Sequence, residues 1–196
     1  MKKIMFNDRY GLTEAVLSGR KTQTRRIIKF SPIDAKYVND EGWSIGGYVA
    51  SEIINHYSRY NVGEIVAIAQ AYRDIANYND GFLDDRNEVK EEFVSGWANK
   101  MFVRADLMPN RIRITNVRVE RLNDISESDC RAEGIDYVNG YSESYFFGFG
   151  VKTDKGWIKL GNTPREAYAA LIDRISGKGT WESNPYVFVY DFELVK

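Results

Sequence analysis

Cysteine and histidine are nearly absent from this chain, with one Cys130 and one His56 among 196 residues. A single cysteine excludes an internal disulfide, and the two residues together are too few for a structural zinc site. No apolar run approaches the roughly eighteen residues of a membrane span, and Ile4-Met5-Phe6 is too short for the core of a signal peptide. We therefore expect a soluble, cytoplasmic protein with no membrane partner, no metal and no cofactor.

An excess of charge of either sign is also missing. Lysine and arginine number 27 against 28 acidic residues, a formal charge of −1. No global field then attracts nucleic acid, so any such binding must come from a local patch. With 43% hydrophobic residues the chain can bury a substantial core. We expect a single domain over residues 1–196, with insertions near 30–60 and 136–161 where Gly, Ser and aromatic residues replace regular periodicity.

The stretch Gly19-Arg-Lys-Thr-Gln-Thr-Arg-Arg26 is the densest cluster of chemistry in the chain, with four cations and two threonines in eight residues. Upstream, apolar spacing predicts a helix over 8–18, and Gly19 falls where a left-handed residue would end it. Downstream, 22–29 reads as a strand. The basic residues of 20–29 therefore lie at a helix-to-strand corner. A solvated strand edge, which Lys and Arg commonly protect, is the alternative interpretation.

The rest of the pattern alternates strands and helices, which predicts an α+β class. Strands are expected at 3–6, 65–72, 111–121 and 185–195, the last apolar on both faces and hence central in its sheet. A bulge near Thr115-Asn116 would bring the apolar residues of 111–121 to one side. Ser126 and Thr163 are expected to cap two helices, the first ended by Gly134. Segment 73–96 reads as a solvated loop with a short helix.

The basic corner also resembles a known family. Gly19-x-Lys21-x-x-Thr24-x-Arg26 is similar to the G-x-K-x-x-E-x-R signature of ASCH domains, PUA-like proteins associated with RNA. Thr24 replaces the usual Glu, as in the small bacterial N4-acetylcytidine amidohydrolases, which carry a similar G-R-K-T-x-T-x-R run. Residues 125–134 look like the family's short helix ending in a functional Glu, and 181–192 like its closing barrel strand. The resemblance covers about 4–29, 61–72, 100–135 and 163–195, and it implies a small mixed β-barrel with flanking helices.

The resemblance further implies a catalytic set of Lys21, Thr24 and Glu133, acting as base, nucleophile and proton shuttle on N4-acetylcytidine. Arg20, Arg25 and Arg26 are the expected ligand contacts. Because residues 21 and 24 point to opposite faces of a regular strand, this reading requires Lys21 to lie in the turn before the strand. RNA or a modified nucleoside is the expected partner. A non-catalytic RNA-binding module, or a phage accessory protein using the same basic corner, is the competing hypothesis.

Overall fold

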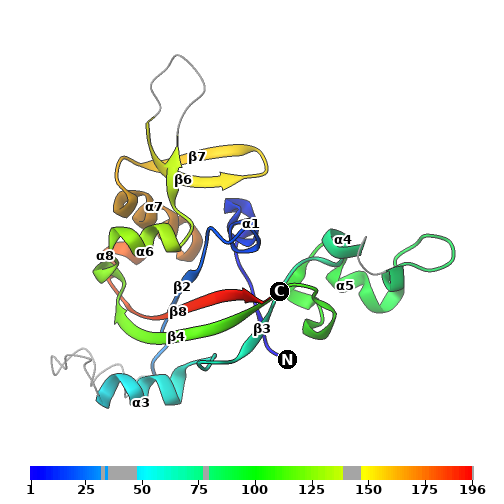
Figure 1. Cartoon of the computed structure of the whole chain (residues 1–196), viewed down its shortest axis with the longest axis horizontal. Coiled ribbons are helices and arrows are strands. Elements are labelled where there is room, and N and C mark those ends of the chain that lie inside the picture. Colours follow the sequence, from blue (N-terminus) through cyan, green and yellow to red (C-terminus); the bar gives the residue numbers. More distant parts are fainter. Residues whose placement is uncertain (32–33, 35–47, 77–79, 139–146, 196) are drawn as a thin grey trace.

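A mixed sheet of five strands forms the centre of the computed structural model, which describes residues 1–31, 34, 48–76, 80–138 and 147–195 (Figure 1). The strands follow the order β1-β3-β4-β8-β2. Their bounds are Lys3–Ile4 (β1), Gln23–Ile27 (β2), Ile65–Ile68 (β3), Arg111–Arg121 (β4) and Tyr186–Val195 (β8). β1 pairs with β3 in parallel, and the other neighbours are antiparallel. The predicted α+β class is confirmed.

The described strands form an open sheet, which corrects the expectation of a closed barrel. β1 and β2 are the two edges, and no backbone ladder joins them among the described residues. β1 is only two residues long and is paired to β3 alone. Across the opening, the guanidinium of Arg26 donates a hydrogen bond to the Met5 carbonyl at 2.6 Å. One side chain therefore spans the space that a closed barrel would fill with strand pairing.

The bulge and the central strand are as predicted. The register of β4 against β8 shifts between Ile114 and Asn116, and Val117 joins Ile112 and Ile114 in the core. β8 lies between β4 and β2. It buries Val187 and Val189 on one face and Phe188 and Tyr190 on the other.

The helix predicted over 8–18 is divided into a 3-10 turn at Asp8–Tyr10 and α1 at Leu12–Leu17. Gly11, at φ +62°, joins the two, and a Cβ there would stand 2.0 Å from the Lys152 carbonyl oxygen. Only glycine meets both conditions. The other helices of the main body are α3 (Tyr48–Tyr57), α6 (Glu127–Ala132), α7 (Pro164–Ser176) and α8 (Thr180–Ser183), with a 3-10 turn at Leu122–Asp124.

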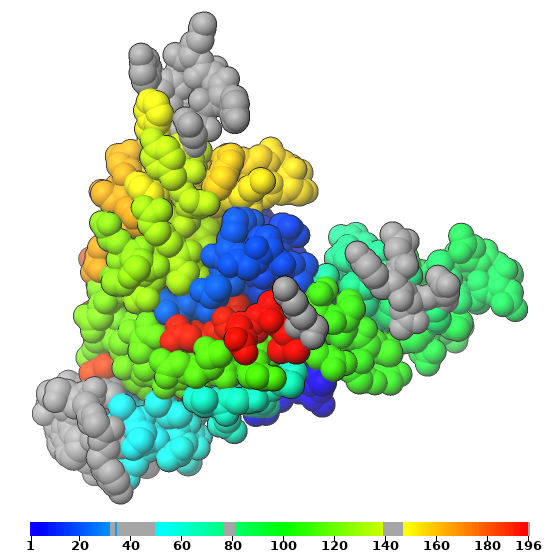
Figure 2. Space-filling model, in the orientation of Figure 1, coloured from blue at the N-terminus to red at the C-terminus, as the bar shows by residue number. Residues whose placement is uncertain are grey.

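A second, antiparallel sheet occupies the predicted insertion at 136–161. Its strands are β5 (Asp136–Val138), β6 (Gly148–Thr153) and β7 (Gly156–Gly161), in that order. α6 and α7 lie between the two sheets (Figure 1), and the N-terminal segment fills the space between β8 and the second sheet (Figure 2). In the other insertion the described structure is α3, and the hairpin expected around Asp40–Gly42 lies outside the described residues.

Residues around 67–108 form a lobe that projects to one side of the main sheet (Figures 1 and 2). It is more ordered than the solvated loop predicted for 73–96, because it has a hydrophobic cluster of its own. The rings of Tyr72, Phe82 and Phe93 meet with centroids 4.7–5.2 Å apart. Its helices are α4 (Tyr72–Ile75) and α5 (Val94–Trp97), with 3-10 turns at Asp80–Phe82, Glu91–Phe93, Lys100–Phe102 and Ala105–Leu107. Throughout the described residues, no helix has the length and apolar character to cross a membrane.

Candidate functional site

The turn between α1 and β2 places Lys21 outside the strand. Gly19 adopts φ +75°, and its amide donates to the Val16 carbonyl at 2.9 Å, which ends α1 as predicted. The Lys21 amide then donates to the Ala15 carbonyl at 2.8 Å, and β2 begins at Gln23. Lys21 therefore lies in the turn before the strand, the position that the catalytic hypothesis requires.

Glu133 lies at the C-terminal end of α6, next to the turn that holds Lys21. Ser126 caps this helix by accepting a hydrogen bond from the Asp129 amide at 3.1 Å, and Gly134 follows its end at φ +98°. The Thr22 amide donates to the Ala132 carbonyl at 2.9 Å, which ties the end of α6 to the start of β2. Glu133 is thereby held opposite Lys21.

Lys21 and Glu133 form a buried ion pair. The Lys21 Nζ donates to Glu133 Oε2 at 2.5 Å, to the Glu133 carbonyl at 2.9 Å and to the Gln23 carbonyl at 2.7 Å. An ammonium group has three donors, so these three acceptors use all of them. The Lys21 residue is only 2% exposed. Burial lowers the pKa of Lys21, Glu133 opposes that effect, and the charges of Arg26 and Arg25 add to it.

Thr24 completes the predicted catalytic set by position. It lines a cavity of about 420 Å³ together with Lys21 and Glu133. Its hydroxyl makes no hydrogen bond to another residue in the described part of the chain, including Lys21. Lys21, Thr24 and Glu133 therefore line one cavity, but only Lys21 and Glu133 contact each other through a hydrogen bond.

The three arginines predicted to contact a ligand have separate environments. Arg25 is buried and donates to Glu120, Gln23, Asp129 and Glu133 at 2.5–3.3 Å. The guanidinium group of Arg25 is thus bound by three carboxylates and one side-chain amide. Its contact with Glu133 helps to hold that side chain in place. Arg26 is exposed and lines the Lys21 cavity. Arg20 lines a different, smaller cavity of about 150 Å³ beside Gly134.

The ion pairs continue beyond Arg25. Arg118 donates to Asp191 at 2.8 Å, to Glu120 at 3.1 Å and to Asp129 at 3.4 Å. Gln23 donates to Asp191 at 2.6 Å and to Asp129 at 3.1 Å. This network connects β2, β4, β8 and α6. It reaches the Lys21–Glu133 pair through Arg25, which also lines the cavity.

Tyr168, on α7, lines the site but is not among the residues that the sequence analysis predicted for it. It lines the Lys21 cavity, and its buried hydroxyl has no hydrogen-bond partner among the residues that the structure describes. The Arg25 Cζ lies 6.0 Å from the centroid of its ring. Burial raises the pKa of Tyr168 well above its ordinary value, and the charge of Glu133 adds to the effect. Only the phenol within an otherwise aliphatic stripe could have indicated a polar role.

Within the described residues, no group of three or more His, Cys, Asp or Glu side chains is placed to hold a metal ion. Comparisons with family models, with curated proteins and with solved structures find no match to this chain. The resemblance to ASCH domains therefore rests on the sequence motifs alone.

Proposed function

We propose that this chain is a PUA-like protein of the ASCH type that acts on RNA or a modified nucleoside in the Lys21 cavity. The reaction we propose is hydrolysis of the N4-acetyl amide of acetylcytidine. The observation that carries the proposal is the meeting of Lys21 and Glu133, 112 residues apart in sequence, at 2.5 Å on the wall of a cavity that Thr24 also lines. Thr24 and Lys21 line the same cavity, and the Thr24 hydroxyl has no hydrogen-bond partner among the described residues, so it is available to approach the amine as a nucleophile approaches its base.

In this mechanism Glu133 takes a proton from Lys21 across their short contact, and burial favours the neutral amine that results. The amine turns toward Thr24 and accepts the hydroxyl proton while the oxygen attacks the acetyl carbon. The C–N bond then breaks, and cytidine leaves with a proton returned through Glu133. Water hydrolyses the acetyl-threonine ester to acetate. Arg25 is the positioning residue for Glu133, and Arg26 is the contact for the substrate.

A binding module without catalysis is the second candidate. The observation that favours it is the full use of the Lys21 donors by Gln23 and Glu133, which leaves none directed at Thr24. The ion pair would then stabilise the cavity wall, and Arg26 would hold a phosphate of RNA.

A chromatographic assay separates the two candidates. Purified protein is incubated with N4-acetylcytidine, and cytidine is measured for the native chain and for Lys21→Ala, Thr24→Ala and Thr22→Ala. Thr22 is an exposed threonine two positions away, so it is a matched control. We expect native and Thr22→Ala turnover alike, and a loss of about 10³-fold or more in the other two.

The pH dependence of kcat gives a second test. Because the reacting form keeps one proton shared between Lys21 and Glu133, and this proton is delivered to the leaving cytidine, the rate should fall as the pH rises through the lowered pKa of Lys21, along a limb centred below 10.5. No turnover by the folded native protein, or undiminished turnover by Thr24→Ala, would refute the hydrolase and leave the binding module.

A further inference from the structure

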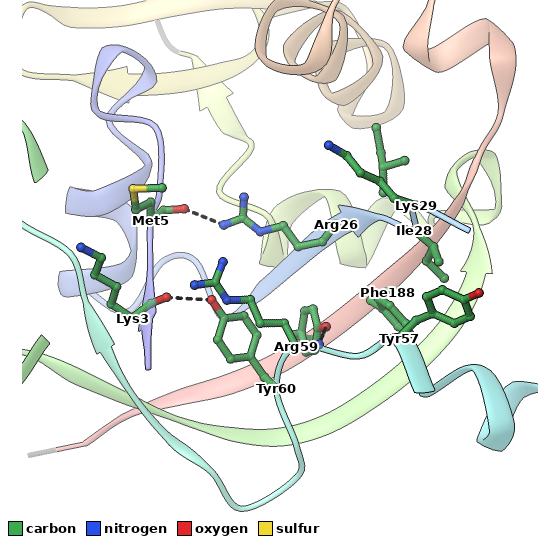
Figure 3. A pocket seen from close by; sticks show the side chains of 11 residues that line it. Lys3, Met5, Arg26, Ile28, Lys29, Tyr57, Arg59, Tyr60 and Phe188 are labelled. Carbon is green, nitrogen blue, oxygen red and sulfur yellow. Dashed lines mark hydrogen bonds between the residues drawn. The ribbon is translucent and has the colours of Figure 1, made fainter. Parts of the chain in front are cut away.

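A second cavity, of about 400 Å³, opens between the two edges of the five-stranded sheet (Figure 3). Phe188 and Tyr190 of β8 lie along it, and Tyr57 at the end of α3 borders it together with Arg59 and Tyr60. It shares several lining residues with the Lys21 cavity: Met5, Arg26, Ile27 and Lys29. The end of β2 is therefore a wall common to both.

Three cations at this second cavity have no ion-pair partner within the described ranges of the chain. Arg26, Lys29 and Arg59 are exposed, and none forms an ion pair with a carboxylate in the described part of the chain. The described lining of the cavity also contains no Asp or Glu. The contrast with Arg25 and Arg118, each paired with several carboxylates, is sharp.

Two of the cations converge. Figure 3 shows Arg26 and Arg59 extending toward the same end of the cavity, beside Met5 and Lys3. Arg26 is anchored by the Met5 carbonyl at 2.6 Å, and the Arg59 Cζ lies 5.6 Å from the centroid of the Tyr60 ring. Burial raises the pKa of Tyr60, while Arg59 and Arg26 both oppose that rise, as two cations near one hydroxyl must. Their guanidinium groups therefore act on one small region.

Lys3 does not belong to this group of cations. Its Nζ donates to the carbonyls of Met101 at 2.7 Å and Val103 at 2.6 Å, outside the cavity. Its backbone carbonyl instead accepts the Tyr60 hydroxyl at 2.9 Å, which fixes the ring beneath Arg59. The aromatic support for Arg59 is thus held by the first strand.

Guanidinium groups placed together without a carboxylate repel each other, and an anion relieves that repulsion. This excess of positive charge is local to the cavity, because the whole chain carries a formal charge of −1. Arginine donors match the oxygens of a phosphate, and a cavity of about 400 Å³ is large enough for a small organic ligand. The buried side chains of Ile28 and Phe188 give such a ligand an apolar surface beside the charged end.

We propose that this second cavity binds the phosphate of a nucleotide, with Arg26 and Arg59 as direct contacts and Lys29 at the wall shared with the Lys21 cavity. The phosphate site stands on its own geometry, whereas the nucleotide rests on the proposed function. A nucleoside in the Lys21 cavity would carry its phosphate past Arg26 into the second cavity. The phosphate can belong to a free nucleotide or to a strand.

Calorimetric titration of the full chain tests the site. The probes are cytidine, cytidine monophosphate, inorganic phosphate and a single-stranded RNA of about six cytidines, at two salt concentrations. The variants are Arg59→Gln, Arg26→Gln and the control Arg9→Gln. Arg9 is also exposed and lies over the next tyrosine, with its Cζ 5.8 Å from the Tyr10 ring centroid, but it does not line the cavity.

We expect the monophosphate to bind more tightly than cytidine, and Arg59→Gln to weaken it about tenfold while Arg9→Gln leaves it within about twofold. RNA binding tighter than the monophosphate, with a salt dependence reduced in Arg59→Gln, would identify a strand. Equal binding of the two would identify a free nucleotide.

The site would be overturned if phosphate-bearing probes bound no better than cytidine. It would equally be overturned if Arg59→Gln and Arg26→Gln both behaved like Arg9→Gln. Turnover of N4-acetylcytidine is measured on the same native preparation. Turnover without phosphate binding would refute this site alone, and phosphate binding without turnover would refute the hydrolase alone.

Discussion

Replacing Lys21 by methionine removes the donor at the centre of the buried ion pair while keeping an unbranched apolar side chain of nearly the same length. Glu133 would keep only the 3.3 Å contact from Arg25 to Oε1, and the carbonyls of Gln23 and Glu133 would lose the Lys21 donor. A carboxylate that is almost fully buried would be left short of compensating charge.

Breaking one partner of a buried ion pair costs about 3–5 kcal/mol, and we expect Lys21→Met to lie in that range. In a chain of this length each kcal/mol lowers the melting temperature by about 2–4 °C, so the loss is roughly 6–20 °C. Glu133→Gln keeps an acceptor for Arg25 and removes the unpaired charge. The double variant should therefore cost about 1–3 kcal/mol less than the sum of the single variants.

Urea unfolding of the four proteins, followed by circular dichroism, measures these differences. Lys2→Met is the matched control, because Lys2 makes an ion pair with Glu64 at 3.1 Å while its side chain is 45% exposed. Surface pairs of this kind contribute about 0–1 kcal/mol. The reasoning fails if Lys21→Met costs no more than Lys2→Met, or if the two single losses simply add in the double variant.

Two further predictions follow from the groups beside the site. Burial alone would raise the pKa of Asp129, but the Gln23 hydrogen bond and the charges of Arg25 and Arg118 outweigh it and hold the pKa below 3.8. This carboxylate therefore stabilises the fold above that pH and ceases to do so as the pH falls below it, so the stability gap between native protein and Asp129→Asn should shrink below about pH 4. Urea midpoints across pH would show this, and a constant gap would contradict it. Burial raises the pKa of Cys130 from 9.0 to about 11, so its thiolate fraction at pH 8 is about a hundredfold lower. Native protein should react with a thiol reagent at least that much more slowly than urea-unfolded protein, and equal rates would show an accessible thiol.

Local signals in the sequence determined much of the framework. Ser126 and Thr163 cap their helices as predicted, and Gly19 and Gly134 adopt positive φ at helix ends. The bulge in β4 followed from the parity of its valines and isoleucines. Each of these features depends on residues within about seven positions of one another, so the sequence alone is sufficient to predict them.

The sequence motifs also identified Lys21, Thr24 and Glu133 as one set, and the structure places them around one cavity. The sequence could not specify which acceptors the Lys21 ammonium group would bind. The three Lys21 donors bind acceptors on Gln23 and Glu133, which are two and 112 positions away. That none of them is directed at Thr24 is therefore visible only in the tertiary structure.

The arginines show the same division. Arg25 and Arg26 are consecutive in a strand, so their opposite orientation was predictable, but which face is buried depends on α6 and β4 packing there. Arg59 lies in the segment between α3 and β3, and only the tertiary packing brings it to the same cavity as Arg26 of β2. Sequence determined the residue types and the local turns. The tertiary structure decided which cations are neutralised by carboxylates and which have no such partner among the described residues, because that depends on residues distant in the chain.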